Sequence, residues 1–233
     1  MSTIDLNLQA IGRTIIATSQ EFSRAPDAVQ LLAVSKTFGA DAVQAAVAAG
    51  QRAFGENYLQ EALDKQRAVA ELVPGVALDW HFIGPIQSNK TRPIAEHFAW
   101  VHTVDRLKIA QRLSEQRPDG LPDLNICLQV NISGEASKSG VSPAELPALA
   151  AQVAALPRLR LRGLMAIPEP LEAFEQQRAA FAQLRQLYEQ LRADGMALDT
   201  LSMGMSADLR AAIAEGATIV RVGSAIFGAR NYH

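Results

Sequence analysis

The sequence predicts a single (β/α)8 barrel, a TIM barrel, spanning residues 1 to 233. Eight short apolar stretches rich in Val, Ile and aromatic residues alternate with longer segments of helical spacing. The chain length suits one barrel of this kind, and no linker, repeat or low-complexity tract divides it. Because parallel strands joined by helices need cover on both faces, eight such units favour a closed barrel over an open sheet.

The predicted strands and helices follow one another in strict order. The strands are expected at residues 31–36, 52–57, 79–84, 100–105, 125–131, 161–167, 200–206 and 218–228. Seven helical stretches connect them; Ser142 and Glu145 form a capping box for one, and Ser206 with Asp208 marks the start of the last. No helix is expected after the final strand, so the amphipathic segment 3–23 is predicted to complete the outer ring.

Composition excludes several classes of function. The 22 Lys and Arg residues nearly balance the 24 Asp and Glu residues, which gives a net charge of −2 and no basic footprint for nucleic acid or an anionic membrane. No apolar run reaches transmembrane length, and the N-terminus lacks the pattern of a signal peptide. The single cysteine, Cys127, is expected to be a buried thiol in a reducing compartment, so we expect a cytoplasmic protein.

A lysine, Lys36, ends the first predicted strand in the stretch "LLAVSKTFG". Alternation along a strand places Leu32, Val34 and Lys36 on one face, and functional residues of this fold gather at the carboxyl ends of the strands. An amine near apolar walls has a pKa below its usual value of about 10.4 and can attack a carbonyl group. The residues alone also allow the alternative that Lys36 is a solvated lysine at a strand end.

Glycine, serine and arginine gather after the last two strands, in "SMGMSADL" and "RVGSAIFGAR". Ser206, Gly223 and Ser224 lie where this fold commonly holds a phosphate. Arg221, between two valines, forms either a structural ion pair or a donor to a ring nitrogen of a ligand. Together with Lys36, these residues predict a pocket for pyridoxal 5′-phosphate (PLP).

Longer motifs extend this interpretation. The stretches "AVSKT", "FGENYLQEALDK", "WHFIGPIQSNK", "VNISGEASKSG", "RGLMAIP" and "LSMGMSADLRAAIAEGATIVRVGSAIFGAR" closely resemble the YggS/PROSC family of pyridoxal phosphate homeostasis proteins. The resemblance runs nearly end to end and implies an alanine racemase-like barrel of PLP fold type III.

The resemblance also implies the roles of individual residues. By it, Lys36 is the Schiff-base lysine, Asn57 lies beside the cofactor and Arg221 faces the pyridine nitrogen. The implied phosphate ligands are Ser206, Gly223 and Ser224. Many members have Thr where Ser224 stands, and either residue supplies a hydroxyl.

The function implied is intracellular PLP homeostasis by buffering and delivery, with little or no turnover. The expected partners are PLP itself and, transiently, PLP-dependent apoenzymes, with a monomeric protein. One alternative is an amino-acid racemase, although racemases of this type draw a second base from a further domain, and an arginine cannot protonate the pyridine nitrogen. A second alternative, from the residues alone, is a Schiff-base aldolase acting on a phosphorylated sugar.

Other polar and sulfur-containing residues are expected to be structural. His81 is predicted to be packed and hydrogen bonded, and the four histidines lack the spacing of a zinc site. Met203 and Met205 alternate on one strand face and are predicted to lie in the core.

Overall fold

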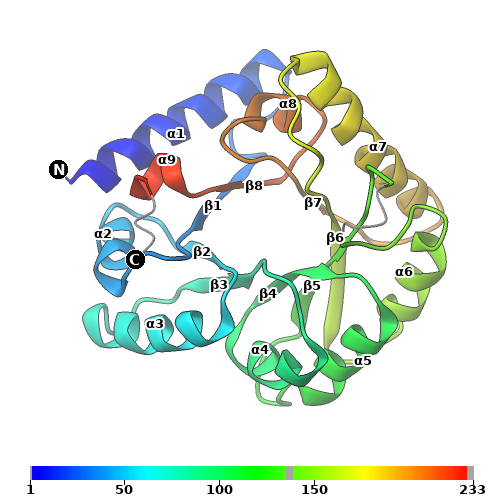
Figure 1. Ribbon diagram of the computed structural model, residues 1–233, viewed down its shortest axis with the longest axis horizontal. Helices are drawn as coiled ribbons and strands as arrows, with labels where there is room; N and C mark the ends of the chain where they lie inside the picture. The colour runs from blue at the N-terminus through cyan, green and yellow to red at the C-terminus, as the bar shows by residue number, and fades with distance from the viewer. Residues whose placement is uncertain (1, 135–138, 230–233) are drawn as a thin grey trace.

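Eight parallel strands form a closed barrel in a computed structural model, which describes residues 2–134 and 139–229 (Figure 1). The strands pair in chain order, and the last pairs with the first, so the predicted fold is confirmed. They are β1 (Gln30–Val34), β2 (Ala53–Glu56), β3 (Asp79–Phe82), β4 (Trp100–Val104), β5 (Leu124–Gln129), β6 (Leu159–Met165), β7 (Thr200–Ser202) and β8 (Ile219–Val222).

Helices surround the barrel as an outer ring (Figure 1). They are α1 (Thr3–Glu21), α2 (Ala40–Ala48), α3 (Leu59–Leu72), α4 (Thr91–His97), α5 (Leu107–Gln116), α6 (Leu146–Ala154), α7 (Phe174–Ala193), α8 (Leu209–Ala214) and α9 (Ser224–Phe227), with the 3-10 helix η1 (Ser88–Lys90) before α4. The N-terminal helix α1 contacts α2, α8 and α9, and therefore fills the predicted gap in the ring. Among residues 2–134 and 139–229, no helix combines the length and apolar character needed to cross a bilayer.

Two sequence expectations about helix starts are wrong. The final strand ends at Val222, and the short helix α9 follows it, because Gly223 has a backbone conformation (φ −118°, ψ −80°) that leaves the extended region. Helix α8 begins at Leu209 after Asp208, not at Ser206. The Asp208 carboxylate instead accepts a hydrogen bond from the Met205 amide (2.6 Å), which forms a turn that leaves Ser206 exposed.

The predicted capping box at Ser142 forms, although helix α6 begins only at Leu146. The Ser142 hydroxyl accepts a hydrogen bond from the Glu145 amide (3.3 Å) and donates one to the Glu145 carboxylate (2.6 Å). Both residues thus belong to the turn that leads into the helix.

The core has an inner and an outer part. Leu32, Ala53 and Ile219 pack together in one buried cluster, and a larger cluster joins the strands to the helices. Cys127 belongs to the fully buried residues, as predicted, and burial raises the pKa of its thiol to about 12.

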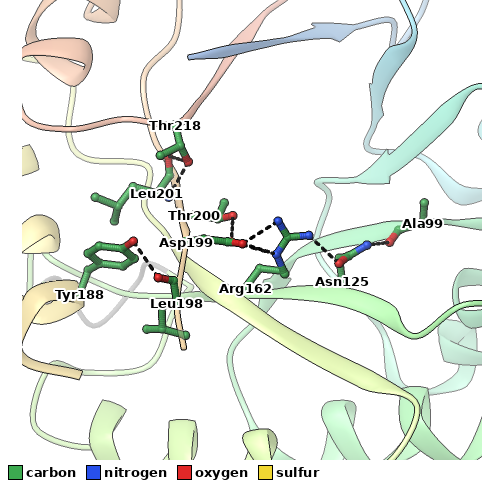
Figure 2. Close-up of polar contacts among 9 residues, drawn as sticks. All are labelled: Ala99, Asn125, Arg162, Tyr188, Leu198, Asp199, Thr200, Leu201 and Thr218. Atoms are coloured by element: carbon green, nitrogen blue, oxygen red, sulfur yellow. Dashed lines mark hydrogen bonds and ion pairs between the residues drawn. The ribbon is translucent and has the colours of Figure 1, made fainter. Parts of the chain in front are cut away.

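A polar network ties the strand starts together at the N-terminal face (Figure 2). The Arg162 guanidinium donates from Nε and Nη2 to the Asp199 carboxylate (2.8 and 2.9 Å) and from Nη1 to Asn125 Oδ1 (2.9 Å). Asn125 in turn donates to the Ala99 carbonyl (3.1 Å). The charges of Arg162 and Asp199 at this face are therefore paired, as expected for a face that supports stability while the opposite mouth carries function.

Candidate cofactor-binding site

A pocket of about 290 Å³ opens at the C-terminal mouth of the barrel. All six predicted site residues line it: Lys36, Asn57, Ser206, Arg221, Gly223 and Ser224. They come from the ends of β1, β2, β7 and β8 and from the loops that follow, so neighbouring strands bring together residues that are far apart in the sequence. The remaining lining residues are apolar: Val34, Ile83, Ile167, Met205 and Ala207.

Lys36 lies two residues beyond the end of β1 and is half-buried. The predicted strand thus ends two residues too late, and the turn after Val34, rather than strand alternation, directs this lysine into the pocket. The next residue, Thr37, has a φ of 68°, in the left-handed region that β-branched residues rarely occupy.

Arg221 is buried in β8, and its hydrogen-bond partners are uncharged. Its Nη1 donates to the Ser202 hydroxyl (2.7 Å), and its Nη2 donates to the Ala166 carbonyl (3.2 Å). Within residues 2–134 and 139–229, no carboxylate lies within ion-pair distance of it. Burial lowers the pKa of the guanidinium to about 10, while the charge of Asp208 acts in the opposite direction. A positive charge that has no direct counter-ion in the described part of the chain therefore borders the pocket, which favours an anionic or electron-rich ligand.

A buried chain of hydrogen bonds continues from Arg221 across the barrel. The Ser202 hydroxyl lies 2.7 Å from His102 Nδ1, and His102 Nε2 lies 2.8 Å from His81 Nδ1. Because arginine only donates, Ser202 accepts from Arg221 and can donate its own proton to His102, which then donates to His81. We assign the tautomers from this order of donors.

Both histidines in this chain are neutral. Burial lowers the pKa of His81 to about 3 and that of His102 well below its usual value. The prediction that His81 is packed and hydrogen bonded is therefore confirmed, and its Nε2 is left without a partner in the part of the chain that the structure describes. Sequence reasoning missed Ser202 and His102, which no local pattern connects.

The pocket residues meet the requirements of a small phosphorylated aromatic aldehyde. Asn57 Oδ1 is buried without a hydrogen-bond partner among the described residues, so it offers an acceptor to a ligand. At Gly223 a Cβ would lie 3.2 Å from the Val34 carbonyl oxygen, so a side chain there would crowd the lining. Ser206 and Ser224 expose hydroxyls suited to a phosphate, and Lys36 supplies an amine.

One core prediction is wrong. Met203 is fully buried, but Met205 is 42% exposed and lines the pocket. The reason is that β7 ends at Ser202 and Gly204 has a φ of 99°, so strand alternation does not reach Met205. Ile167, 44% exposed, is a lining residue that sequence reasoning missed, although its place just after a strand end was the available signal.

Comparison with known proteins assigns the chain to a family. Residues 6–231 match the alanine racemase N-terminal domain family. The chain is 66% identical over 232 residues to a pyridoxal phosphate homeostasis protein of Pseudomonas aeruginosa, with 100% of this chain and 98% of the relative covered. It belongs to the family of pyridoxal phosphate homeostasis proteins. A family member from Escherichia coli K12 is 54% identical over 233 residues, with 100% and 99% covered.

Solved structures show the same barrel. PipY of Synechococcus elongatus PCC7942, solved with PLP bound, matches with a TM-score of 0.83 at 40% identity, covering 97% of this chain and 100% of that chain. An alanine racemase from Corynebacterium glutamicum matches with a TM-score of 0.70 at 17% identity, covering 97% of this chain and 61% of that one. The second likeness concerns the fold alone.

Proposed function

We propose that this protein binds PLP at the mouth of its barrel and buffers and delivers the cofactor in the cytoplasm, with little or no catalytic turnover. The observation that carries the proposal is the buried Arg221 cation, which has no carboxylate partner among the described residues and faces a pocket that also holds an amine and two hydroxyls. The family relatives named for pyridoxal phosphate homeostasis and the PLP-bound PipY support it.

Each lining residue has a place in this proposal. Lys36 attaches the cofactor covalently through its aldehyde, and Asn57 lies beside the ring. Arg221 donates toward the pyridine nitrogen. The phosphate is held by Ser206, Gly223 and Ser224. When bound, the cofactor supplies an aldehyde that reacts with amines and a ring that withdraws electrons.

We expect low catalytic turnover because few side chains that line the pocket can transfer a proton. Among the described residues that line the pocket, Lys36 and Arg221 are the ones with titratable side chains. With a pKa of about 10, Arg221 stays protonated at neutral pH and leaves the pyridine nitrogen unprotonated. Racemisation by two bases needs a second proton-transferring group on the opposite face of the substrate. The pocket therefore supports binding better than catalysis.

The protein is proposed to act as a monomer that transiently contacts PLP-dependent apoenzymes. The six residues proposed to hold the cofactor all belong to this chain. Exposed Ile167 and Met205 at its rim leave the cofactor accessible from outside.

The deciding experiment compares absorbance spectra of the purified protein and of a Lys36→Ala variant, with and without added PLP. Borohydride reduction and peptide mapping by mass spectrometry then locate the cofactor. We expect a visible band of lysine-bound cofactor in the native protein alone, with the reduced adduct on Lys36. No band in the native protein would overturn the proposal, and a lysine that stays free would favour the aldolase. Rapid conversion of a common amino acid would favour the racemase.

A further inference from the structure

Three charged residues of the stretch "FGENYLQEALDK" gather behind the pocket, on its helix side. Lys65, in α3, is 5% exposed, and its amine donates to the carboxylates of Glu56 (2.6 Å) and Glu61 (2.9 Å). It also donates to the backbone carbonyl of Ser35 (2.7 Å), whose hydroxyl donates to Glu56 (2.6 Å). We call Ser35, Glu56, Glu61 and Lys65 the Lys65 clamp.

The clamp holds the backbone on both sides of Lys36. On one side Lys65 binds the Ser35 carbonyl, and on the other the Thr37 amide donates to Glu61 Oε1 (2.6 Å). Both peptide groups that flank the cofactor lysine are thus tied to a single helix. Glu56 ends β2 directly before Asn57, so the clamp also joins the ends of two strands that contribute pocket residues.

Stability alone does not account for this arrangement. A buried ion cluster is often no more stabilising than apolar side chains of the same volume. Burial raises the pKa of the Glu56 carboxyl against the influence of Lys65, and its Oε2 has no hydrogen-bond partner among the described residues. Thr37 keeps its left-handed conformation, which persists only where the surroundings enforce it. A buried carboxyl with a raised pKa and a strained backbone conformation, both next to a reactive lysine, are typical of a functional site.

We propose that Lys65 and Glu61 are positioning residues that fix the backbone of Lys36 so that its amine meets the cofactor aldehyde. The inference rests on the proposed function. Attachment would form a C=N double bond between Lys36 Nζ and the aldehyde carbon and break the aldehyde C=O bond, whose oxygen leaves as one water molecule with two protons from the amine. If the clamp is loosened, this step slows while the rest of the pocket still binds the ring and phosphate.

The test separates attachment from binding. Stopped-flow absorbance measures the rate of attachment at saturating PLP, and a titration measures the affinity for pyridoxine 5′-phosphate, which carries an alcohol in place of the aldehyde. The variants are Glu61→Ala, Glu61→Gln and Lys65→Met. Arg67→Ala is the matched control, because it removes an exposed ion pair with Asp64 on the same helix.

Glu61→Ala and Lys65→Met are expected to slow attachment by roughly tenfold or more, because small misplacements of a reacting group are costly. Affinity for pyridoxine 5′-phosphate should stay within about twofold of wild type. Glu61→Gln, which keeps an acceptor for the Thr37 amide, and Arg67→Ala should attach PLP at the wild-type rate.

An unchanged attachment rate in folded Glu61→Ala would overturn the proposal. A loss of pyridoxine 5′-phosphate affinity as large as the loss of attachment rate would also overturn it. Glu61 is partly exposed, with 35% of its side chain accessible, so its variants carry the test if Lys65→Met does not fold. A wild-type protein that fails to bind PLP would instead refute the proposed function, so the two failures are distinguishable.

Discussion

Lowering the pH from 7 to 5 should destabilise the cofactor-free protein through His81 and His102. Both are buried and neutral in the folded state, with pKa values far below the usual 6.5. In the unfolded chain they bind protons as the pH falls below about 6.5, whereas in the folded protein they do not. The unfolded state thus binds more protons, and stability falls with falling pH. The full contribution is present above about pH 6.5.

The size of the effect follows from the pKa values. Each histidine contributes about 1.4 kcal/mol per pH unit between its unfolded and folded pKa values. Because the folded pKa of His81 is about 3, its contribution between pH 6.5 and pH 5 is about 2 kcal/mol. The pKa of His102 is lowered in the same direction by burial, so this histidine adds to the loss of unfolding free energy at pH 5.

Urea unfolding of the wild type and of His81→Asn at both pH values measures this. The asparagine Oδ1 can accept a hydrogen bond from His102 Nε2, as His81 Nδ1 does in the native protein. Unlike histidine, the asparagine side chain does not titrate. The variant should lose about 2 kcal/mol less than the wild type between pH 7 and pH 5. The carboxyls with raised pKa values, Glu56 and Asp208, affect both proteins equally and cancel. Equal losses in the two proteins, or titration of folded His81 near pH 6.5 by NMR, would refute the reasoning.

Four further substitutions or reactions test other parts of the barrel. Arg162→Met should lower the unfolding free energy in urea by about 1 kcal/mol, because Asn125 loses its donor while the half-exposed Asp199 carboxylate is partly re-solvated, yet leave PLP affinity within about twofold. Gly163→Ala should cost roughly 3 kcal/mol or more, or give insoluble protein, because its Cβ would lie 1.7 Å from the Thr200 carbonyl oxygen. Gly12→Ala, inside α1 with open space around it, should instead raise stability by about 0.5 to 1 kcal/mol. Cys127 should not react with a thiol reagent at pH 8 until urea unfolds the protein, since burial raises its pKa to about 12.

The sequence was sufficient for the barrel because strand and helix periods are local. It was less reliable at element ends, where two local signals compete: Ser206 and Asp208 both resemble a helix cap, and the turn at Met205 decides between them. The predicted final strand extends beyond Gly223, because the apolar run in the sequence continues where the backbone turns. Alternation placed Met205 in the core for the same reason.

The predicted pocket residues lie together because the barrel brings the ends of its strands to one mouth. What surrounds them was not predictable from one sequence. The His81–His102–Ser202 chain joins three strands, with separations of 21 and 100 residues between its bonded partners. The Lys65 clamp spans 30 residues between the amine and the Ser35 carbonyl. Such contacts depend on side-chain placement in the folded barrel, and no local spacing encodes them.

The buried or partly buried arginines at the two ends of the barrel differ in their partners. At the N-terminal face the Arg162 guanidinium is paired to a carboxylate, so the network contributes stability. At the mouth, the fall in the pKa of Arg221 from 12.5 to about 10 corresponds to about 3 kcal/mol that disfavours its charged form. A ligand that receives a hydrogen bond from this guanidinium recovers part of that free energy on binding. The cofactor-free state is therefore destabilised where the cofactor binds, and PLP should raise the unfolding temperature of the native protein more than that of Arg221→Met.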